Sequence, residues 1–223
     1  MKKYVLMLIV AFVACGFGTK AFAYDCEVDG IYYYRTSATE LEVACKVFSD
    51  NNRTAYSGSV TIPSTVTYMG KTFNVTSIGE YAFYNCTAIN ALTLPTGITE
   101  LGMGAFEGCS ALTQMTIPAG ISVVEDELFY GCSAMKVVVL PPSITAIGEN
   151  AFTRCTSLLS VYLQATTAPS CEMNAFDKVD RTWCTLYIPK GSASYQQEGV
   201  WKDFFIEEFE GKVEDVKMNI QLP

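Results

Sequence analysis

Four cysteines recur at a fixed interval of 23 residues, and their thiols could bind a metal, form disulfides or act as nucleophiles. They are Cys86, Cys109, Cys132 and Cys155. Zinc prefers a tetrahedral cluster of Cys and His ligands, but the chain has no His, and equal spacing predicts a line of side chains. A disulfide needs Cβ atoms that converge to about 3.8 Å, whereas identical positions in stacked repeats point their Cβ atoms in parallel. We therefore expect buried free thiols that behave as small hydrophobic side chains.

Two further pairs of cysteines lie closer to the ends of the chain. These are Cys26 with Cys45, and Cys171 with Cys184. In an oxidising compartment each pair can form a disulfide or stay reduced, and the sequence leaves both possibilities open.

Carboxylates offer the remaining candidates for catalysis. A glycosidase needs only two of them, and the densest acidic run is Glu125-Asp126-Glu127. A run of like charges beside a turn is typical of a solvated surface, which is our expectation here. We expect Asp50-Asn51-Asn52 to form a turn, because a calcium loop of the EF-hand type needs a longer alternating set of oxygen ligands. With no His, no P-loop and no nucleophile-elbow motif, we predict no enzymatic activity, no metal and no other cofactor.

The cysteines belong to a longer repeated motif, which shows the elements that must position them. A Phe precedes each of these cysteines by three residues, giving the column Phe83, Phe106, Phe129 and Phe152, which Phe176 continues one residue late. Upstream lies an apolar-x-apolar-Pro stretch such as Leu92-Thr93-Leu94-Pro95, and its prolines also step by 23 residues. Alternation closed by a proline predicts a short strand followed by a turn. A fixed period of this length predicts a solenoid of stacked units with the phenylalanines in its core.

The combined pattern, L-x-x-h-x-h-P followed by h-x-x-I-G-x-x-A-F-x-x-C with h apolar, resembles the BspA-like leucine-rich repeats of bacterial surface and secreted proteins. It spans about residues 57–189; residues 28–33 resemble the opening strand of such proteins and residues 186–192 their closing segment. The resemblance implies an α/β leucine-rich-repeat solenoid, a curved stack of short parallel strands joined by turns or short helices. It also implies adhesion or other extracellular binding, and it brings no catalytic residues.

We divide the chain into a signal peptide at 1–23, an N-terminal β cap at 24–53, the repeats at 54–189 and a C-terminal cap at 190–223. Strands are expected at 31–35 and 41–47 in the first cap. In the second cap we expect a short helix that begins at Ser192 and reaches Trp201. The aromatic side chains of Trp201, Phe204 and Phe205 should close the last repeat.

The first 23 residues predict export. A basic start, an apolar run and the small-residue site Ala21-Phe22-Ala23 are typical of a Sec signal peptide cleaved after Ala23. Lipid attachment at Cys15 is the less favoured alternative. Cleavage removes three lysines and no acid, so the net charge moves from −8 to −11, which disfavours nucleic acid as a partner. The apolar run is short for a membrane span and no second candidate follows, so we expect a secreted, cell-surface or periplasmic protein without an integral span.

The strands also predict a surface for a ligand. In each apolar-x-apolar-Pro strand the middle residue should face away from the core, as should the residue two positions earlier. Stacking the strands gives two outward columns, whose side chains are small and polar in the first repeats and apolar or aromatic in the last repeats. Their candidate ligand-binding residues are Thr93, Thr116, Val137, Val139, Tyr162 and Tyr187.

Exposed aromatic and β-branched residues on a rigid sheet are typical of contact sites, although such residues also suit any exposed strand. We predict a non-enzymatic protein that binds an extracellular protein or a host-surface component. A glycan-binding module and a structural spacer in an envelope assembly are the alternatives.

Overall fold

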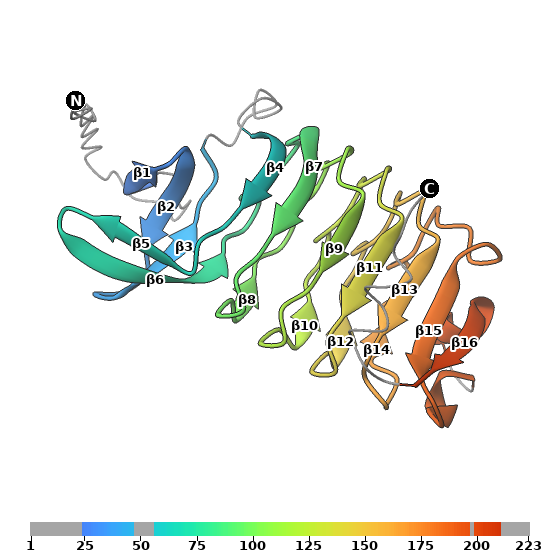
Figure 1. The fold of residues 1–223 in the computed structure, drawn as a ribbon. Helices are drawn as coiled ribbons and strands as arrows, with labels where there is room; N and C mark the ends of the chain where they lie inside the picture. Colours follow the sequence, from blue (N-terminus) through green and yellow to red (C-terminus); the bar gives the residue numbers. More distant parts are fainter. Residues whose placement is uncertain (1–23, 47–55, 197–198, 211–223) are drawn as a thin grey trace, which may run out of the picture.

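The repeats stack into an elongated solenoid of parallel strands (Figure 1). The computed structural model describes residues 24–46, 56–196 and 199–210. One long strand comes from each repeat and from the C-terminal cap: β4 (Ser57–Thr61), β7 (Ala88–Thr93), β9 (Gln114–Thr116), β11 (Val137–Leu140), β13 (Ser160–Leu163), β15 (Thr185–Pro189) and β16 (Phe205–Phe209). β4 pairs with β7, and a second parallel sheet contains β9, β11, β13, β15 and β16 in that order. Val138 is in register with Met115 on one side and Val161 on the other, so each rung repeats the one before it.

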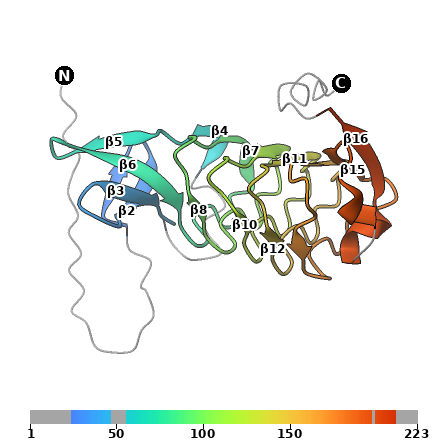
Figure 2. The ribbon, with the colours of Figure 1, turned by 90° about the horizontal axis from the view of Figure 1, so that it is seen from below.

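A second row of two-residue strands lies across the solenoid from the long strands (Figure 2). It contains β8 (Glu100–Leu101), which pairs with β6 (Lys71–Ile78), and the parallel series β10 (Val123–Val124), β12 (Ala146–Ile147) and β14 (Ser170–Cys171). The side chains between the two rows form the core.

The segments that carry the Phe and Cys residues are tight turns. Cys86 N donates to Phe83 O at 3.0 Å within a rung, while Phe106 N donates to Leu128 O of the next rung at 3.0 Å. Because the backbone groups are satisfied between rungs, no helical hydrogen bonds are needed here. The described residues contain no α-helix. The predicted solenoid is confirmed, whereas the helical part of the predicted α/β class is wrong.

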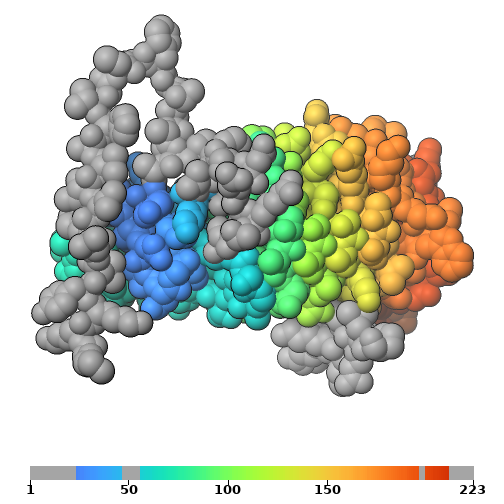
Figure 3. Space-filling view, turned by 90° about the horizontal axis from the view of Figure 1, so that it is seen from above, coloured from blue at the N-terminus to red at the C-terminus, as the bar shows by residue number. Residues whose placement is uncertain are grey.

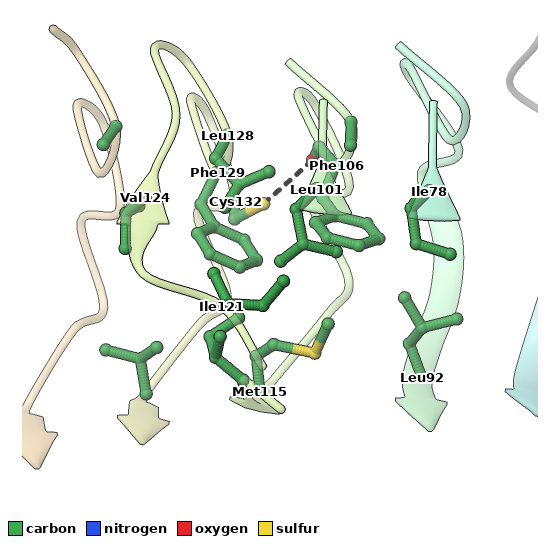
Figure 4. Close-up of a cluster of buried hydrophobic side chains, with 14 of the residues drawn as sticks. Ile78, Leu92, Leu101, Phe106, Met115, Ile121, Val124, Leu128, Phe129 and Cys132 are labelled. Carbon is green, nitrogen blue, oxygen red and sulfur yellow. Dashed lines mark hydrogen bonds between the residues drawn. The ribbon is translucent and has the colours of Figure 1, made fainter. Parts of the chain in front are cut away.

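The Phe column runs through the middle of the core. The five rings are 0% exposed, and successive centroids from Phe83 to Phe176 lie 5.7, 5.4, 5.4 and 4.9 Å apart with interplanar angles of 11–16°. Figure 4 shows Phe106 and Phe129 between the two strand rows, with Leu101 and Ile121 beside them. The position of the Phe column in the core is therefore confirmed.

The N-terminal cap is a small meander that joins the first repeat. β1 (Cys26–Val28), β2 (Ile31–Arg35) and β3 (Glu40–Val43) pair antiparallel, and β3 runs parallel to β6, which forms a hairpin with β5 (Thr65–Tyr68). Positive φ angles at Asp29 and Gly30 suit the two-residue turn between β1 and β2. The strand at 31–35 was predicted correctly, and the next strand is shorter than predicted. The ring of Tyr56 covers the open end of the Phe column, 4.9 Å from Phe83.

The C-terminal cap closes the other end with two 3₁₀ segments, Ala193–Gln196 and Gly199–Asp203, followed by strand β16. The predicted helical cap is therefore wrong. Trp201 and Phe204 are buried and meet the Phe176 ring edge-on, as expected for a plug. Phe205 is 60% exposed instead, because it begins β16 and its side chain points to the face opposite that of Phe204.

Caps and repeats form one continuous body in the space-filling view (Figure 3). None of the helical segments that the structure describes is long and apolar enough to cross a bilayer. The predicted signal peptide with Cys15 and the predicted turn at 50–52 lie outside the described residues.

Candidate functional site

The cysteine column is an internal, chemically quiet feature. Cys109, Cys132 and Cys155 each donate from Sγ to the carbonyl oxygen of the Phe 26 residues earlier, at 3.2 Å. Figure 4 shows the bond from Cys132 to Phe106. Burial raises the pKa of Cys109 and Cys132 well above the usual range, and that of Cys155 to about 12. These thiols therefore stay protonated, and a protonated thiol is a poor nucleophile and a poor metal ligand.

Cys45 and Cys184 extend this column at its two ends. Cys45 is close enough to Cys86 to contribute to its raised pKa, and Cys184 contributes in the same way to the raised pKa of Cys155. None of the eight described cysteines forms a disulfide, so neither Cys26 and Cys45 nor Cys171 and Cys184 are bridged in this structure. Across the described residues, no group of three or more His, Cys, Asp or Glu side chains is arranged to hold a metal ion.

The two predicted outward columns are in register across the long strands. Thr116 is paired with Val139, Val139 with Tyr162, and Tyr162 with Tyr187. Thr93 and Thr116 are exposed, as is Gln114 beside Val137. Val137, Val139 and Tyr162 form an apolar cluster separate from the main core, which agrees with their expected position on the opposite face of the sheet.

The expectation that all six candidates are exposed is wrong for three of them. Val137, Val139 and Tyr162 are only 6, 3 and 6% exposed, and Tyr187 is half-buried. The rings of Tyr162 and Tyr187 stack with centroids 4.4 Å apart and an interplanar angle of 8°, and the ring of Phe209 meets Tyr162 edge-on at 6.3 Å. Bulky side chains in register on neighbouring strands thus cover one another, a contact that the pattern within one strand does not reveal.

The exposed apolar surface lies next to Tyr187, on the last strand of the sheet, β16. Phe205 of β16 is in register with Thr185, so it shares the outer face of the sheet with Tyr187 and Phe209. We call Tyr187, Phe205 and Phe209 the C-terminal patch; the buried cluster of Val137, Val139 and Tyr162 supports it. The sequence reasoning assigned Phe205 to the core and did not consider Phe209. The period-2 alternation of Phe205, Glu207 and Phe209 was the signal that could have placed both on this face.

The C-terminal patch has an acidic border. Glu207 is in register with Tyr187 on the outer face of the sheet, and its side chain is exposed. Burial, with a smaller contribution from Glu207, raises the pKa of Tyr187. The tyrosine hydroxyl therefore stays protonated and can donate a hydrogen bond to a ligand.

A groove on the turns is a second candidate site, which the sequence reasoning missed. It has a volume of about 660 Å³, and its lining includes Asn85, Glu107, Tyr130, Arg154 and Lys178. The Arg154 guanidinium lies over the Tyr130 ring, 5.5 Å from its centroid. Burial and the neighbouring carboxylate of Glu127 raise the pKa of Glu107 to about 7.

The acidic run beside this groove is only partly the solvated surface that was expected. Asp126 is exposed and accepts a hydrogen bond from Glu149 N at 2.7 Å, whereas Glu125 and Glu127 are half-buried. Burial raises the pKa of Glu125, with Asp126 adding to the effect.

The parallel strands, the 23-residue period and the column of core phenylalanines define a β-solenoid of the leucine-rich-repeat type. A family model described as "BspA type Leucine rich repeat region" matches residues 52–181 in 6 copies. The chain therefore belongs to the BspA-type leucine-rich-repeat family, as the resemblance in its sequence predicted.

Solved structures of bacterial leucine-rich-repeat proteins share the fold. One from Bacteroides ovatus is 22% identical, with a TM-score of 0.54 over 74% of this chain and 55% of that protein. One from T. pallidum is 22% identical, with a TM-score of 0.53 over 77% of this chain and 70% of that protein. This chain thus spans about half the length of the Bacteroides ovatus protein. No curated protein matches the sequence.

Proposed function

We propose that the chain is a secreted or cell-surface binding protein without catalytic activity, and that it contacts an extracellular protein through the C-terminal patch. The observation that carries this proposal is the 60% exposure of Phe205 beside the half-buried rings of Tyr187 and Phe209. Large apolar side chains gathered on one face are typical of interaction sites. Family membership is compatible with such a role.

The support beneath the patch favours tight binding. Phe205 lies on a strand whose five residues pair with β15, and the Tyr187 ring stacks on the buried Tyr162. An anchor held on a rigid sheet loses little conformational freedom when a partner binds. Exposed Thr93, Thr116 and Gln114 continue the same face as a polar surface on β7 and β9, beyond the buried cluster that supports the patch.

The charges indicate the chemistry of the partner. Glu207 borders the patch, and the chain carries a net charge of −8. A protein with an apolar anchor surrounded by basic side chains fits this surface, because opposite charges speed association and oppose wrong partners. Raising the salt concentration should slow the association.

Export is part of the proposal and rests on residues 1–23. The basic start, the apolar run and the site after Ala23 support secretion by the Sec route, and a lipid anchor at Cys15 is the alternative. Mass spectrometry of the exported protein decides between an N-terminus at Tyr24 and a lipidated one at Cys15.

The binding test uses the chain from Tyr24 against immobilised extracellular-matrix proteins and polysaccharides. We expect a protein ligand whose affinity falls at least tenfold in Phe205→Ser and in Phe205→Ser combined with Tyr187→Ser. Trp183→Ser is the matched control, because Trp183 is 78% exposed and lies outside the patch. Circular dichroism checks that every variant is folded.

Three other outcomes of this binding test would contradict the proposal. Equal binding by wild type and patch variants places the contact elsewhere. Binding to polysaccharides alone supports the glycan-binding alternative, and binding to neither class supports a structural spacer.

A further inference from the structure

The groove on the turns exists because two successive rungs have a glycine at one position of the turn. The residue just before the Cys position has a positive φ in five consecutive rungs. This position holds Asn85, Gly108, Gly131, Arg154 and Lys178, with φ angles of 55°, 71°, 72°, 64° and 67°. Glycine and asparagine adopt this backbone conformation readily. Gly108 and Gly131 both line the groove; the Asn85 side chain lies over Gly108, and the space over Gly131 is open.

The same position carries long cations in the next two rungs, where the fold does not require them. Arg154 and Lys178 adopt a left-handed conformation that is unfavourable for such residues, although glycine serves in the rungs before them. Strained residues of this kind concentrate at functional sites. Both cations line the groove. A role in ligand binding accounts for this choice of residues.

These cations are available to a ligand. The two ion pairs among the described residues are Arg181–Asp203 and Lys190–Glu210, so neither Arg154 nor Lys178 takes part in one. Both residues are exposed. Contact with the Tyr130 ring helps to hold the guanidinium of Arg154 in place, and a guanidinium can bind a carboxylate through two parallel hydrogen bonds.

We propose that the groove binds a saccharide that carries a carboxylate group, such as a uronic or sialic acid residue. Arg154 and Lys178 pair with the carboxylate, the edge of Tyr130 packs against the sugar ring, and Asn85, Ser133 and Thr156 exchange hydrogen bonds with its hydroxyl groups. The volume of about 660 Å³ suits a short oligosaccharide. This site is on the turns and apart from the C-terminal patch, so it goes beyond the proposed function and can be tested separately.

The neighbouring carboxyl group of Glu107 is compatible with an anionic ligand. Burial and Glu127 raise its pKa to about 7, so the protonated form is present near neutral pH, and in that form it can donate to a ligand oxygen. A saccharide, with both donors and acceptors, matches this group better than a simple anion does.

An acidic peptide fits the groove less well. A peptide usually binds by pairing its backbone with free N–H and C=O groups. Here the turn backbone is already paired between rungs: Gly108 N donates to Tyr130 O at 2.7 Å, and Gly131 N donates to Thr153 O at 2.8 Å. The groove is instead lined by side-chain hydroxyl, amide and charged groups, which suit a polyhydroxylated ligand.

The test is calorimetric titration of the chain from Tyr24 with sialyllactose, with trigalacturonate and with lactose as the neutral control. We expect binding of at least one acidic sugar and at least tenfold weaker binding of lactose. Arg154→Asn combined with Lys178→Asn should weaken binding at least tenfold, because asparagine keeps the turn conformation, as at Asn85, and removes both charges. Comparing the two acidic sugars distinguishes sialic from uronic acid.

Two further variants separate the groove from general charge effects. Gly131→Asn places a side chain in the hollow without changing the charge; a Cβ there meets no atom closer than 3.9 Å, so the variant should fold and should not bind. Lys71→Ala removes a cation from the β5–β6 hairpin and should bind like wild type. Affinity that is unchanged in both Gly131→Asn and the Arg154/Lys178 double variant overturns the proposal. So does a failure to bind either acidic sugar, and so does preference for a poly-glutamate peptide.

Discussion

The thiol of Cys132 donates a hydrogen bond to the carbonyl oxygen of Phe106 in the preceding rung, with the sulfur and oxygen atoms 3.2 Å apart. Cys109 and Cys155 make the same contact, so one hydrogen bond recurs along the core. The small apolar volume of Cys fits beside the stacked rings, and its weak donor adds a second hydrogen bond to a carbonyl oxygen that already accepts one from the backbone, as Phe106 O does from Cys109 N at 3.1 Å. This structural role explains a spacing that would otherwise suggest chemistry.

The first prediction concerns the reactivity of these thiols. In the folded chain from Tyr24, a thiol-reactive maleimide should modify Cys132 only as fast as the protein unfolds, because the side chain is fully buried and its pKa is raised. Cys171 is the most accessible described cysteine and should react first. Peptide mapping after timed labelling measures both rates.

The same experiment in urea without reductant counts the free thiols. We expect eight, because none of the described cysteines is in a disulfide, and Cys45 and Cys184 lie beside Cys86 and Cys155. Four would show two disulfides, and peptide mapping would show whether they join Cys26 to Cys45 and Cys171 to Cys184. Rapid labelling of Cys132 in the native state would contradict the assigned core.

The second prediction concerns the Phe column. Phe129→Ala should lower the free energy of unfolding by about 3–5 kcal/mol, because it removes a fully buried ring and leaves a cavity. The rings of Phe106 and Phe152 lose a stacking partner 5.4 Å away, so the loss should be felt in neighbouring rungs. Urea unfolding followed by circular dichroism gives the change, with the exposed Leu159→Ala as the control. A variant as stable as wild type contradicts the register.

The repeat period was sufficient to predict the solenoid and its core. Phe83, Phe106 and Phe129 recur at identical positions of each copy, and only stacking of the copies can bury all of them. The cap helix was not predictable in the same way. The local pattern after Ser192 is compatible with a helix, but the described segments Ala193–Gln196 and Gly199–Asp203 are 3₁₀ turns, and distant contacts such as Trp201 Nε1 to Pro169 O at 3.0 Å hold the second of them. Contacts this distant along the sequence override local preference.

The surfaces were harder to predict than the core. Alternation placed Val139 and Tyr162 on the outer face. Their exposure depends on side chains of the adjacent strands and on Phe209 of β16, whose ring contacts Tyr162 from the far side of β15. The groove depends on the side chains missing from Gly108 and Gly131, and its floor is visible only once the turns are stacked. Comparing the residue before each Cys across the repeats would have revealed the change from glycine to Arg154.

The third prediction is a pH dependence of stability that Glu107 causes. The folded protein raises the pKa of this carboxyl from 4.5 to about 7, so between these values the folded state binds more protons than the unfolded state. Stability from this group therefore rises as the pH falls through this window. Glu107→Gln should be more stable than wild type at pH 8, and the difference should disappear near pH 4.5.

Chemical denaturation at intervals from pH 4.5 to pH 8 measures this effect. Glu208→Gln removes an exposed carboxyl group on β16 and is the control for loss of negative charge. Because the pKa of Glu125 is also raised, some pH dependence should remain in Glu107→Gln. If the free energy of unfolding changes with pH in the same way for wild type and Glu107→Gln, Glu107 is not buried against Glu127 as described.

The last prediction uses two changes at one position of the turn, which should have opposite signs. Lys178→Asn should raise the free energy of unfolding by about 0.5–1 kcal/mol, because asparagine tolerates the φ of 67° better than lysine does. Gly131→Ala should lower it by about 1–2 kcal/mol; the added Cβ has space, so the cost comes from the φ of 72° alone. Thermal unfolding of both variants beside wild type measures the pair. If Lys178→Asn is less stable than wild type, lysine contributes to the fold itself, and its strained conformation no longer indicates a role in binding.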